Sequence, residues 1–464
     1  MADRHLGYRG SCIPFPHGLR SDIPSIPRTS STVPVTLQLQ PVKGTRDVYP
    51  EDMRLRNWLF GIWRETARSF GFEEYDAPVL EHEELYIRKA GDEITEQLYN
   101  FEDKSGRRLA LRPEMTPSLA RLILQRQNTL TFPLKWFAIP QCFRYERMTR
   151  GRRREHFQWN MDVVGQPSWV AEVEILSALV MSLQKMGLSE RHVQIHLNDR
   201  RLLNAVLDHL AVPAEKHLPV LVVMDKRDKV KPEHLAAMLV EQGLSNSQVD
   251  GLERFLHMKT LREVAQNLSD SRMAEDLMLL IGHLHQVGLG GFVQFDITVV
   301  RGLSYYTGTV FEGRDAGASL RAICGGGRYD SLLSSYGGAP IPAIGFGFGD
   351  VVILELLGDL GLLPKLNQEV EFAVIPFSEA EIPAALELSQ RLRRAGFRCD
   401  ADYSLRKLKR ALQRAGEVGA RQALLLMPDE LKQGLVVMRD MARREEIRVP
   451  VAELEQRARA ALGK

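Results

Sequence analysis

Apolar residues recur at helical spacing in two long stretches before residue 190. The first follows Pro50, carries Glu51 and Asp52 in its opening turn and stops at Gly71, which predicts a helix between that proline and that glycine. Its apolar stripe consists of Leu55, Trp58, Leu59 and Ile62. Residues 169–186 predict a second helix, and shorter strand-like runs lie between the two.

Two strand-like segments flank a run of arginines. Residues 136–139 and 159–164 are rich in aromatic and β-branched side chains, which predicts a strand on each side. The loop between them holds six arginines, at positions 144, 147, 150, 152, 153 and 154. Because charges of one sign repel each other, this loop must be solvated or face an anionic partner. It is also longer than a hairpin needs, which favours a binding role.

Residues 345–349 alternate strictly between glycine and phenylalanine. This alternation predicts a strand with one bare face, on which a flat ligand could lie, and one face packed in the core. The chain has neither a Gly-x-Gly-x-x-Gly fingerprint in a βαβ unit nor a Gly-x-x-x-x-Gly-Lys-Ser/Thr loop. Arginines would therefore have to hold the phosphates of any bound nucleotide.

Three further segments carry candidate chemistry. Residues 301–312 are typical of a strand, with their two adjacent tyrosines on opposite faces. Residues 324–330 contain three consecutive glycines and are expected to form a loop. Glu114 and Thr116 place a carboxylate and a hydroxyl two residues apart. The start of a helix and a binding site explain that last pair equally well.

The pattern changes after residue 190. Residues 191–290 are mostly at helical spacing and are expected to form a helical insertion, apart from residues 218–224, whose continuous apolar run suits a buried strand. Strand signals return between 292 and 348, and a linker lies near 361–368. Beyond it strand and helix alternate, which predicts a separate α/β domain. The expected divisions are 1–40, 41–190, 191–290, 291–362 and 370–464.

Charge and cysteine content limit the possible partners. The 464-residue chain has a net charge of +2, so an anionic partner must be bound by local patches. Residues 391–421 form one such patch, with ten basic residues and three acids, which is either a solvated helix face or a nucleic-acid surface. Four scattered cysteines form no Cys-x-x-Cys pair, which argues against structural zinc and a disulfide framework. No apolar run is long enough to span a bilayer.

Residues 1–40 are rich in proline and have little apolar periodicity. Their arginines outnumber their acids, so an organellar targeting segment is one interpretation. Targeting segments are usually poorer in acid and more amphipathic than this, which makes a disordered tail the preferred interpretation. We therefore expect a cytoplasmic protein, with organellar targeting as the alternative.

Four segments in series resemble the histidyl-tRNA synthetases, a family of class II aminoacyl-tRNA synthetases. They are Arg-Pro-Glu-x-Thr at 112–116, Phe-Arg-x-Glu at 143–146, Arg-Gly-Leu-x-Tyr-Tyr at 301–306 and Gly-Gly-Gly-Arg-Tyr-Asp at 325–330. The resemblance covers nearly all of the chain from Lys43 onward. It implies an α+β fold, in which a catalytic domain on an antiparallel sheet carries a helical insertion and is followed by a C-terminal α/β anticodon-binding domain. It also implies a homodimer that joins histidine to its tRNA through a histidyl-adenylate made from ATP.

The resemblance also assigns roles to individual residues. Arg144 and Arg301 would stabilise negative charge on the α-phosphate during catalysis. The histidine-binding residues would be Glu114, Thr116, Gln158, Asp162, Tyr305 and Tyr306. ATP would also contact Glu146 and Arg152, with Mg²⁺ bridging its phosphates and no metal held by the protein itself. The acceptor stem of tRNA would face Arg147, Thr149 and Arg154.

Two positions depart from the family pattern. Asp162 stands where many members carry glutamate, and Val352 stands where class II enzymes usually carry an arginine for the γ-phosphate of ATP. A substitute cation is therefore expected, and Arg152 and Arg328 are the candidates.

Two other functions stay open. One is a histidine-binding regulatory subunit of ATP phosphoribosyltransferase, which resembles the catalytic core. The other is an RNA-binding regulatory protein that has lost catalysis. The full arginine loop, Arg301 with both tyrosines, and the basic terminal domain favour the synthetase over both.

Overall fold

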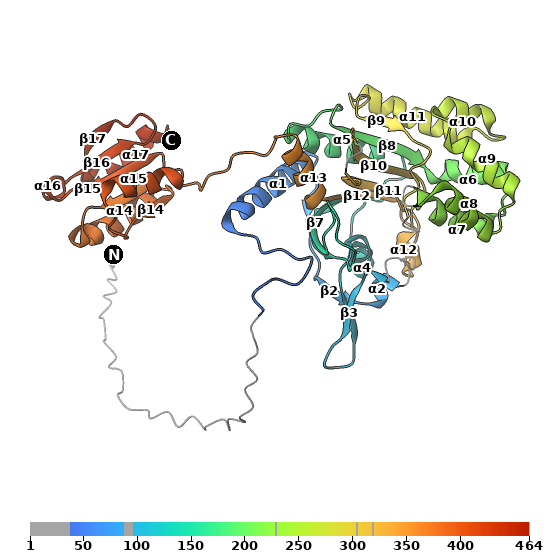
Figure 1. The fold of residues 1–464 in the computed structure, drawn as a ribbon, viewed down its shortest axis with the longest axis horizontal. Coiled ribbons are helices and arrows are strands. Elements are labelled where there is room, and N and C mark those ends of the chain that lie inside the picture. The colour runs from blue at the N-terminus through green and yellow to red at the C-terminus, as the bar shows by residue number, and fades with distance from the viewer. Residues whose placement is uncertain (1–37, 88–95, 228–229, 303–304, 318–319, 464) are drawn as a thin grey trace, which may run out of the picture. The chain divides into compact units, whose positions relative to one another are not determined.

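The structure is a computed structural model that describes residues 38–87, 96–227, 230–302, 305–317 and 320–463 (Figure 1). The chain divides into two units, Met1–Pro41 and Val42–Lys464. The expectation for residues 1–40 therefore lies almost wholly outside the described residues. No helix in the described ranges is long and apolar enough to cross a membrane.

A nine-stranded sheet forms the centre of the part of the chain before residue 361 (Figure 1). The path along it is β1 (Glu73–Glu74), β5 (Leu134–Ala138), β7 (Glu155–Val164), β12 (Ala343–Gly349), β11 (Cys324–Arg328), β10 (Thr309–Asp315), β8 (Val193–Asp199) and β9 (Val293–Phe295). The pairs from β5 to β8 are all antiparallel, whereas β1 and β9 join in parallel at the two ends. The strands predicted around the arginine run are confirmed as β5 and β7. A further short strand, β6 (Gln141–Phe143), pairs with the start of β7.

Aromatic packing ties the first helix to this sheet. Helix α1 (Pro50–Ser69) has a proline in its first turn beside Glu51 and Asp52, and the chain leaves it at Gly71 with φ of +74°, as predicted. The ring of Trp63 on α1 stacks on that of Trp159 on β7, with centroids 5.9 Å apart. Helix α5 (Val170–Lys185) confirms the second predicted helix and packs against α1 and the same strands. Helix α13 (Asp350–Asp359) follows β12 directly and packs on β7.

A smaller, three-stranded sheet is formed by residues that lie between β1 and β5 in the sequence. Its strands run in the order β2 (Leu80–His82), β4 (Arg108–Leu111) and β3 (Tyr99–Glu102). Helices α2 (Glu84–Ile87) and α4 (Thr116–Arg126) accompany it, and α12 (Leu332–Ser335) packs against α4.

Six helices make up most of the region expected to be a helical insertion. They are α6 (Arg200–His209), α7 (Ala214–Met224), α8 (Pro232–Glu241), α9 (Asn246–Leu256), α10 (Leu261–Asn267) and α11 (Arg272–Gln286). The expected boundary at 190 is too early, because β8 lies inside the expected range and pairs with β10 in the large sheet.

The strand predicted at residues 218–224 is also wrong, because this run lies in α7. Leu218 and Val222, one helical turn apart, are exposed, whereas Val220 and Leu221 are buried. A fully apolar run hides such a helical pattern, since every position looks suitable for a core.

The C-terminal domain is a five-stranded α/β unit, as predicted. Its strands lie in the order β14 (Cys399–Ala401), β13 (Phe372–Pro376), β15 (Gln422–Leu426), β16 (Leu435–Asp440) and β17 (Glu446–Pro450). The first three are parallel and the last two antiparallel. Its helices are α14 (Ile382–Arg394), α15 (Leu408–Glu417), α16 (Pro428–Lys432) and α17 (Leu454–Leu462). Two hydrophobic clusters of its own stabilise it on either side of the sheet.

Candidate active site

The glycines of β11 and β12 form a bare patch on one face of the large sheet. Strand β12 has the predicted alternation, with Phe346 and Phe348 buried in the core on the other face. The loop predicted at residues 324–330 is wrong, because residues 324–328 form strand β11 between β10 and β12. In this register Gly325 pairs with Gly347 and Gly327 with Gly345, so glycines lie opposite glycines.

Three side chains from two segments, β7 and the chain before β10, lie over this glycine patch. A Cβ atom on Gly345 would be 2.1 Å from Oδ1 of Asp162. On Gly347 it would be 1.6 Å from Nε2 of Gln158, and on Gly325 it would be 2.4 Å from Cζ of Arg301. Only glycine leaves room for these three side chains. The structure therefore brings two of the expected histidine ligands and one of the expected catalytic arginines to the same face.

The expected histidine-binding residues form a cluster of buried aromatic and acidic groups. The hydroxyl of Tyr305 donates a 3.0 Å hydrogen bond to Oε2 of Glu114. The ring centroids of Tyr305 and Tyr306 are 5.0 Å apart, and that of Tyr329 is 6.0 Å from Tyr305. Both adjacent tyrosines precede β10, so the strand predicted over 301–312 starts later than expected, at Thr309.

Tyr329 belongs to the same cluster and was not among the predicted site residues. Its hydroxyl donates a short hydrogen bond to Oδ1 of Asp162, and both side chains are buried. The residue lies one position after β11, in the segment that was expected to be a loop. The run of three glycines from Gly325 has no alternation of side chains, so no pattern in the sequence indicated the strand or the position of Tyr329 after it.

Burial changes the acidity of the two carboxylates in this cluster. It raises the pKa of Asp162 to about 7, and the hydrogen bond from Tyr329 opposes the rise. Burial also raises the pKa of Glu114, opposed by the positive charge of Arg144 and the hydrogen bond from Tyr305. Asp162 can thus exchange a proton near neutral pH, where an imidazole also titrates.

Thr116 lies at the start of α4, where it is buried. Its hydroxyl contributes a hydrogen bond to the Tyr305 side chain. The helix start predicted at this pair is therefore confirmed by Thr116. The pair also lines the tyrosine cluster, and its role in binding stays a prediction.

Arginines from three separate segments lie near one another beside the glycine patch. Arg144, directly after β6, donates through Nε to the carbonyl of Pro113 at 2.9 Å. Arg301 has a left-handed φ of +58° and lies 3.6 Å from a carboxylate oxygen of Glu312. Both lie close enough to Arg321 to lower its pKa. The two expected catalytic arginines therefore approach a common region.

The arginine loop between β6 and β7 holds its residues in different ways. Arg152 pairs through Nε with Glu146 at 2.7 Å. The Arg154 guanidinium lies over the ring of Tyr145, 3.8 Å from its centroid. Arg147 and Thr149, both expected to face tRNA, are exposed.

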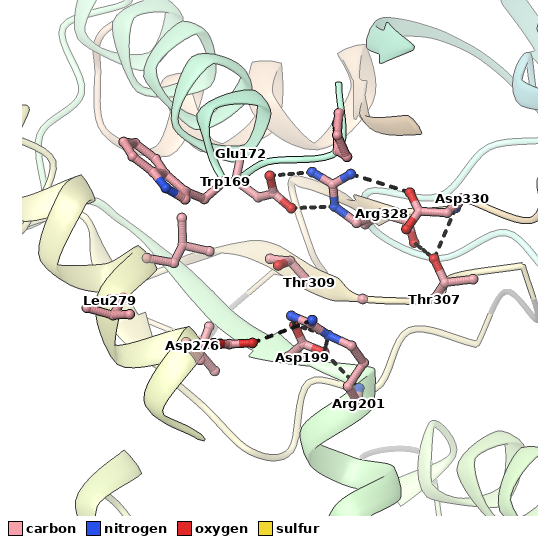
Figure 2. A pocket seen from close by; sticks show the side chains of 14 residues that line it. Trp169, Glu172, Asp199, Arg201, Asp276, Leu279, Thr307, Thr309, Arg328 and Asp330 are labelled. Atoms are coloured by element: carbon pink, nitrogen blue, oxygen red, sulfur yellow. Dashed lines mark hydrogen bonds and ion pairs between the residues drawn. The ribbon is translucent and has the colours of Figure 1, made fainter. Parts of the chain in front are cut away.

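Arg328 does not reach this site, so its expected role as the substitute cation is wrong. In the register of β11 and β12, Arg328 lies opposite Ile344, on the core face of the sheet. Its side chain therefore points away from the glycine patch. There it makes two hydrogen bonds to Glu172 of α5, at 2.6 and 2.5 Å. Figure 2 shows this ion pair at the rim of a cavity of about 310 Å³, where Arg201 likewise pairs with Asp199. The side to which Arg328 points follows from a strand register that was not foreseen.

The first turn of α13 carries no cation towards the site. Asp350 accepts hydrogen bonds from the backbone N–H of Phe157 at 3.0 Å and from the guanidinium of Arg46 at 2.9 Å. Val352 is buried, and its Cγ2 is 3.3 Å from the point where a Cβ on Gly151 would lie. Val352 therefore offers no cation to a nucleotide, in contrast to the arginine usual in class II enzymes. Asp350 has a structural role.

Comparison with known proteins agrees with this geometry. Residues 44–349 match the model of the family described as histidyl-tRNA synthetase, and residues 371–460 match an anticodon binding domain. A histidine–tRNA ligase of Arabidopsis thaliana, described as chloroplastic/mitochondrial, is 46% identical over 420 residues, which cover 90% of this chain and 86% of the relative. A histidine–tRNA ligase of Opitutus terrae is 40% identical over 430 residues, which cover 90% of this chain and 98% of the relative.

A crystal structure of histidyl-tRNA synthetase from Nostoc sp. PCC 7120 has the same fold, with a TM-score of 0.75 and 23% identity, covering 91% of this chain and 99% of that one. The expected antiparallel catalytic sheet with a separate anticodon-binding domain is confirmed by these matches. The chain belongs to the histidyl-tRNA synthetase family.

Proposed function

We propose that this protein is a class II histidine–tRNA ligase that attaches histidine to its tRNA in two steps. The observation that carries the proposal is the convergence of Gln158, Asp162 and Arg301 over the glycine patch of β11 and β12. That patch offers a flat floor, a carboxylate suited to an imidazole, and a fixed cation suited to a phosphate.

Histidine binds in the cluster of tyrosines and carboxylates. The Asp162 carboxylate, oriented by the Tyr329 hydroxyl, accepts the N–H of the imidazole, and Tyr306 contacts the other ring nitrogen. Glu114, Thr116 and Gln158 hold the α-amino group. The side chain of Asp162 is shorter than the glutamate of many relatives. The hydrogen bond from Tyr329 to Oδ1 fixes the carboxylate so that its second oxygen faces the imidazole, which offsets the shorter side chain.

ATP binds beside the histidine carboxylate. An oxygen of that carboxylate attacks the α-phosphorus, a P–O bond to the α-phosphorus forms, and the bond to the bridging oxygen of the β-phosphate breaks to release pyrophosphate. Arg144 and Arg301 stabilise the negative charge that spreads over the α-phosphate oxygens, and neither changes its protonation state. Glu146 and Arg152 extend the nucleotide contacts.

Magnesium arrives with the nucleotide. Phosphate oxygens are ligands that Mg²⁺ prefers, so the nucleotide itself would hold most of the ion's coordination sphere. When bound, Mg²⁺ would supply positive charge that offsets the negative charge of the phosphates and of the leaving pyrophosphate.

The second step transfers the histidyl group to the terminal ribose of tRNA. A ribose hydroxyl attacks the carbonyl carbon of the adenylate, and AMP leaves. Arg147, Thr149 and Arg154 of the arginine loop contact the acceptor stem, and the C-terminal domain binds the anticodon. The protein acts as a homodimer. A cytoplasmic location remains our prediction, and the plant relative makes an organelle the alternative.

Aminoacylation of histidine tRNA by the purified chain tests the proposal, with the other amino acids as controls. Charging with histidine alone supports it. A regulatory subunit of ATP phosphoribosyltransferase would bind histidine without exchanging pyrophosphate into ATP, and an RNA-binding regulator would bind tRNA without forming adenylate. The match to an anticodon binding domain over residues 371–460 favours the ligase over the regulatory subunit.

A further inference from the structure

Positive charge exceeds negative charge at one end of the proposed nucleotide site. Arg144 and Arg321 make no ion pair within the part of the chain that the structure describes. Nearby arginines are already bound, since Arg152 pairs with Glu146, and Arg150 pairs with acids of α13. A cluster of like charges without enough acids favours an anionic ligand.

Arg321 lies where it can meet such a ligand. It precedes β11, the strand that carries Gly325. Its Cγ and Cδ atoms are 3.5 and 3.7 Å from the point where a Cβ on Gly151 would lie, and Val352 contacts the same point at 3.3 Å. The side chains of Arg321 and Val352 thus border the same point beside Gly151, and Arg321 is exposed to solvent.

The surroundings of Arg321 are positively charged. Partial loss of hydration, and then the charge of Arg152, lower the pKa of Arg321 to about 10. Arg144 and Arg301 act in the same direction, and only Glu146 opposes them. Bound polyphosphate would relieve this repulsion between cations.

We propose that Arg321 binds the β- and γ-phosphates of ATP and supplies the cation that Val352 does not. This rests on the proposed function, and it replaces the earlier candidate Arg328, which lies on the other face of the sheet. Arg152 is the weaker candidate, because its guanidinium already serves Glu146. The geometry suits Arg321 because its stem lies next to the position where the family arginine would begin.

Binding measurements with ATP and with AMP test this inference on the full-length chain. Arg321→Ala should weaken ATP by about 10- to 100-fold, the effect expected for losing a charged hydrogen bond, and should leave AMP within about twofold. The Michaelis constant for ATP in histidine-dependent pyrophosphate exchange should rise equally, with that for histidine unchanged. The double variant Val352→Arg/Arg321→Ala carries a cation at position 352 in place of Arg321, so it should recover much of the ATP affinity.

Arg191→Ala is the matched control, because Arg191 is an exposed arginine whose side chain makes no ion pair in the described ranges. It should behave like the parent protein. Unchanged ATP affinity in Arg321→Ala, or equal weakening of ATP and AMP, would overturn the inference. If the parent protein binds both nucleotides but shows no histidine-dependent exchange, the proposed function fails, and the comparison of ATP with AMP still decides the role of Arg321.

Discussion

A Cβ atom on Gly347 would lie 1.6 Å from Nε2 of Gln158, far inside van der Waals contact. The two residues are on neighbouring antiparallel strands, where Gln158 pairs with Gly349. The side chain of Gln158 thus lies across the backbone of β12, in the space that a side chain at 347 would fill. This relationship explains the alternation of glycine and phenylalanine, because one face must pack the core and the other must stay flat.

Gly347→Ala should therefore impair histidine use more than folding. The new methyl group must push Gln158 from its position, so we expect the Michaelis constant for histidine to rise at least about tenfold, the scale of losing one or two hydrogen bonds. Pyrophosphate exchange at varied histidine measures it. Gly282→Ala is the control, since nothing lies within 4 Å of its added Cβ, and it should keep parent kinetics. Parent-like exchange in Gly347→Ala would contradict the assignment of Gln158.

Histidine affinity should depend on the protonation of Asp162. Because its pKa is raised to about 7, the carboxylate that accepts the imidazole N–H forms mainly above neutral pH, and binding should tighten between pH 6 and pH 8. Isothermal titration of histidine across this range measures the change. Asp162→Asn should bind about 10- to 100-fold more weakly at pH 8 and should retain only the pH dependence of histidine itself. Equal pH profiles for both proteins would argue against this role.

Asp162→Asn should weaken histidine binding but should raise the stability of the fold at pH 8. A folded-state pKa above the unfolded value near 4 means that stability is fully present below about pH 4 and is lost as the pH rises through 7. Asp162→Asn removes this loss, so its melting temperature should exceed that of the parent at pH 8, and the difference should shrink towards pH 5. Thermal unfolding at the two pH values provides the comparison. A lower melting temperature at pH 8 would show that the buried carboxylate stabilises the fold.

Arg301→Ala should separate catalysis from RNA binding. Loss of a fixed cation at the reacting phosphate should reduce histidine-dependent exchange by about 100- to 1000-fold, while tRNA affinity stays within about twofold. Exchange kinetics and filter binding of tRNA measure the two properties. If exchange falls by less than threefold, Arg301 does not contact the reacting centre. If tRNA binding falls with it, the substitution has disturbed the fold.

The C-terminal domain presents an exposed basic segment at the start of α15. Its members Arg406, Lys407, Lys409 and Arg410 are exposed and make no ion pair within the described residues. Replacing all four by alanine should raise the Michaelis constant for tRNA by about tenfold or more and weaken its salt dependence, because phosphate contacts release counterions. Exchange without tRNA should remain at the parent rate and serves as the internal control. An unchanged constant for tRNA would leave this segment as a solvated helix face.

Local patterns predicted most of the fold. The helices α1 and α5, the strand β12 and the alternating C-terminal domain were all readable, because each has a periodicity or end signal of its own. Strand β11 was not, since three glycines carry no side-chain pattern, and its pairing depends on β10 and β12. The face of Arg328 and the contact of Tyr329 with Asp162 depend on that pairing too.

The site shows the same division. The resemblance named Gln158, Asp162 and Arg301 as site residues, and the structure brings them to one glycine patch. Arg321 lay outside every motif, and only its position beside Val352 gives it a role. Residues that act through a neighbouring strand or loop can be recognised only once the register is known.

A crystal structure with histidinol and ATP would test the central claim most directly, by measuring how far the guanidinium nitrogens of Arg144 and Arg301 lie from the α-phosphate oxygens. We predict that both lie within about 3 Å of those oxygens, with the imidazole on Asp162. If the two guanidinium groups contact different parts of the ligands, or if the imidazole binds elsewhere, the proposed mechanism is contradicted.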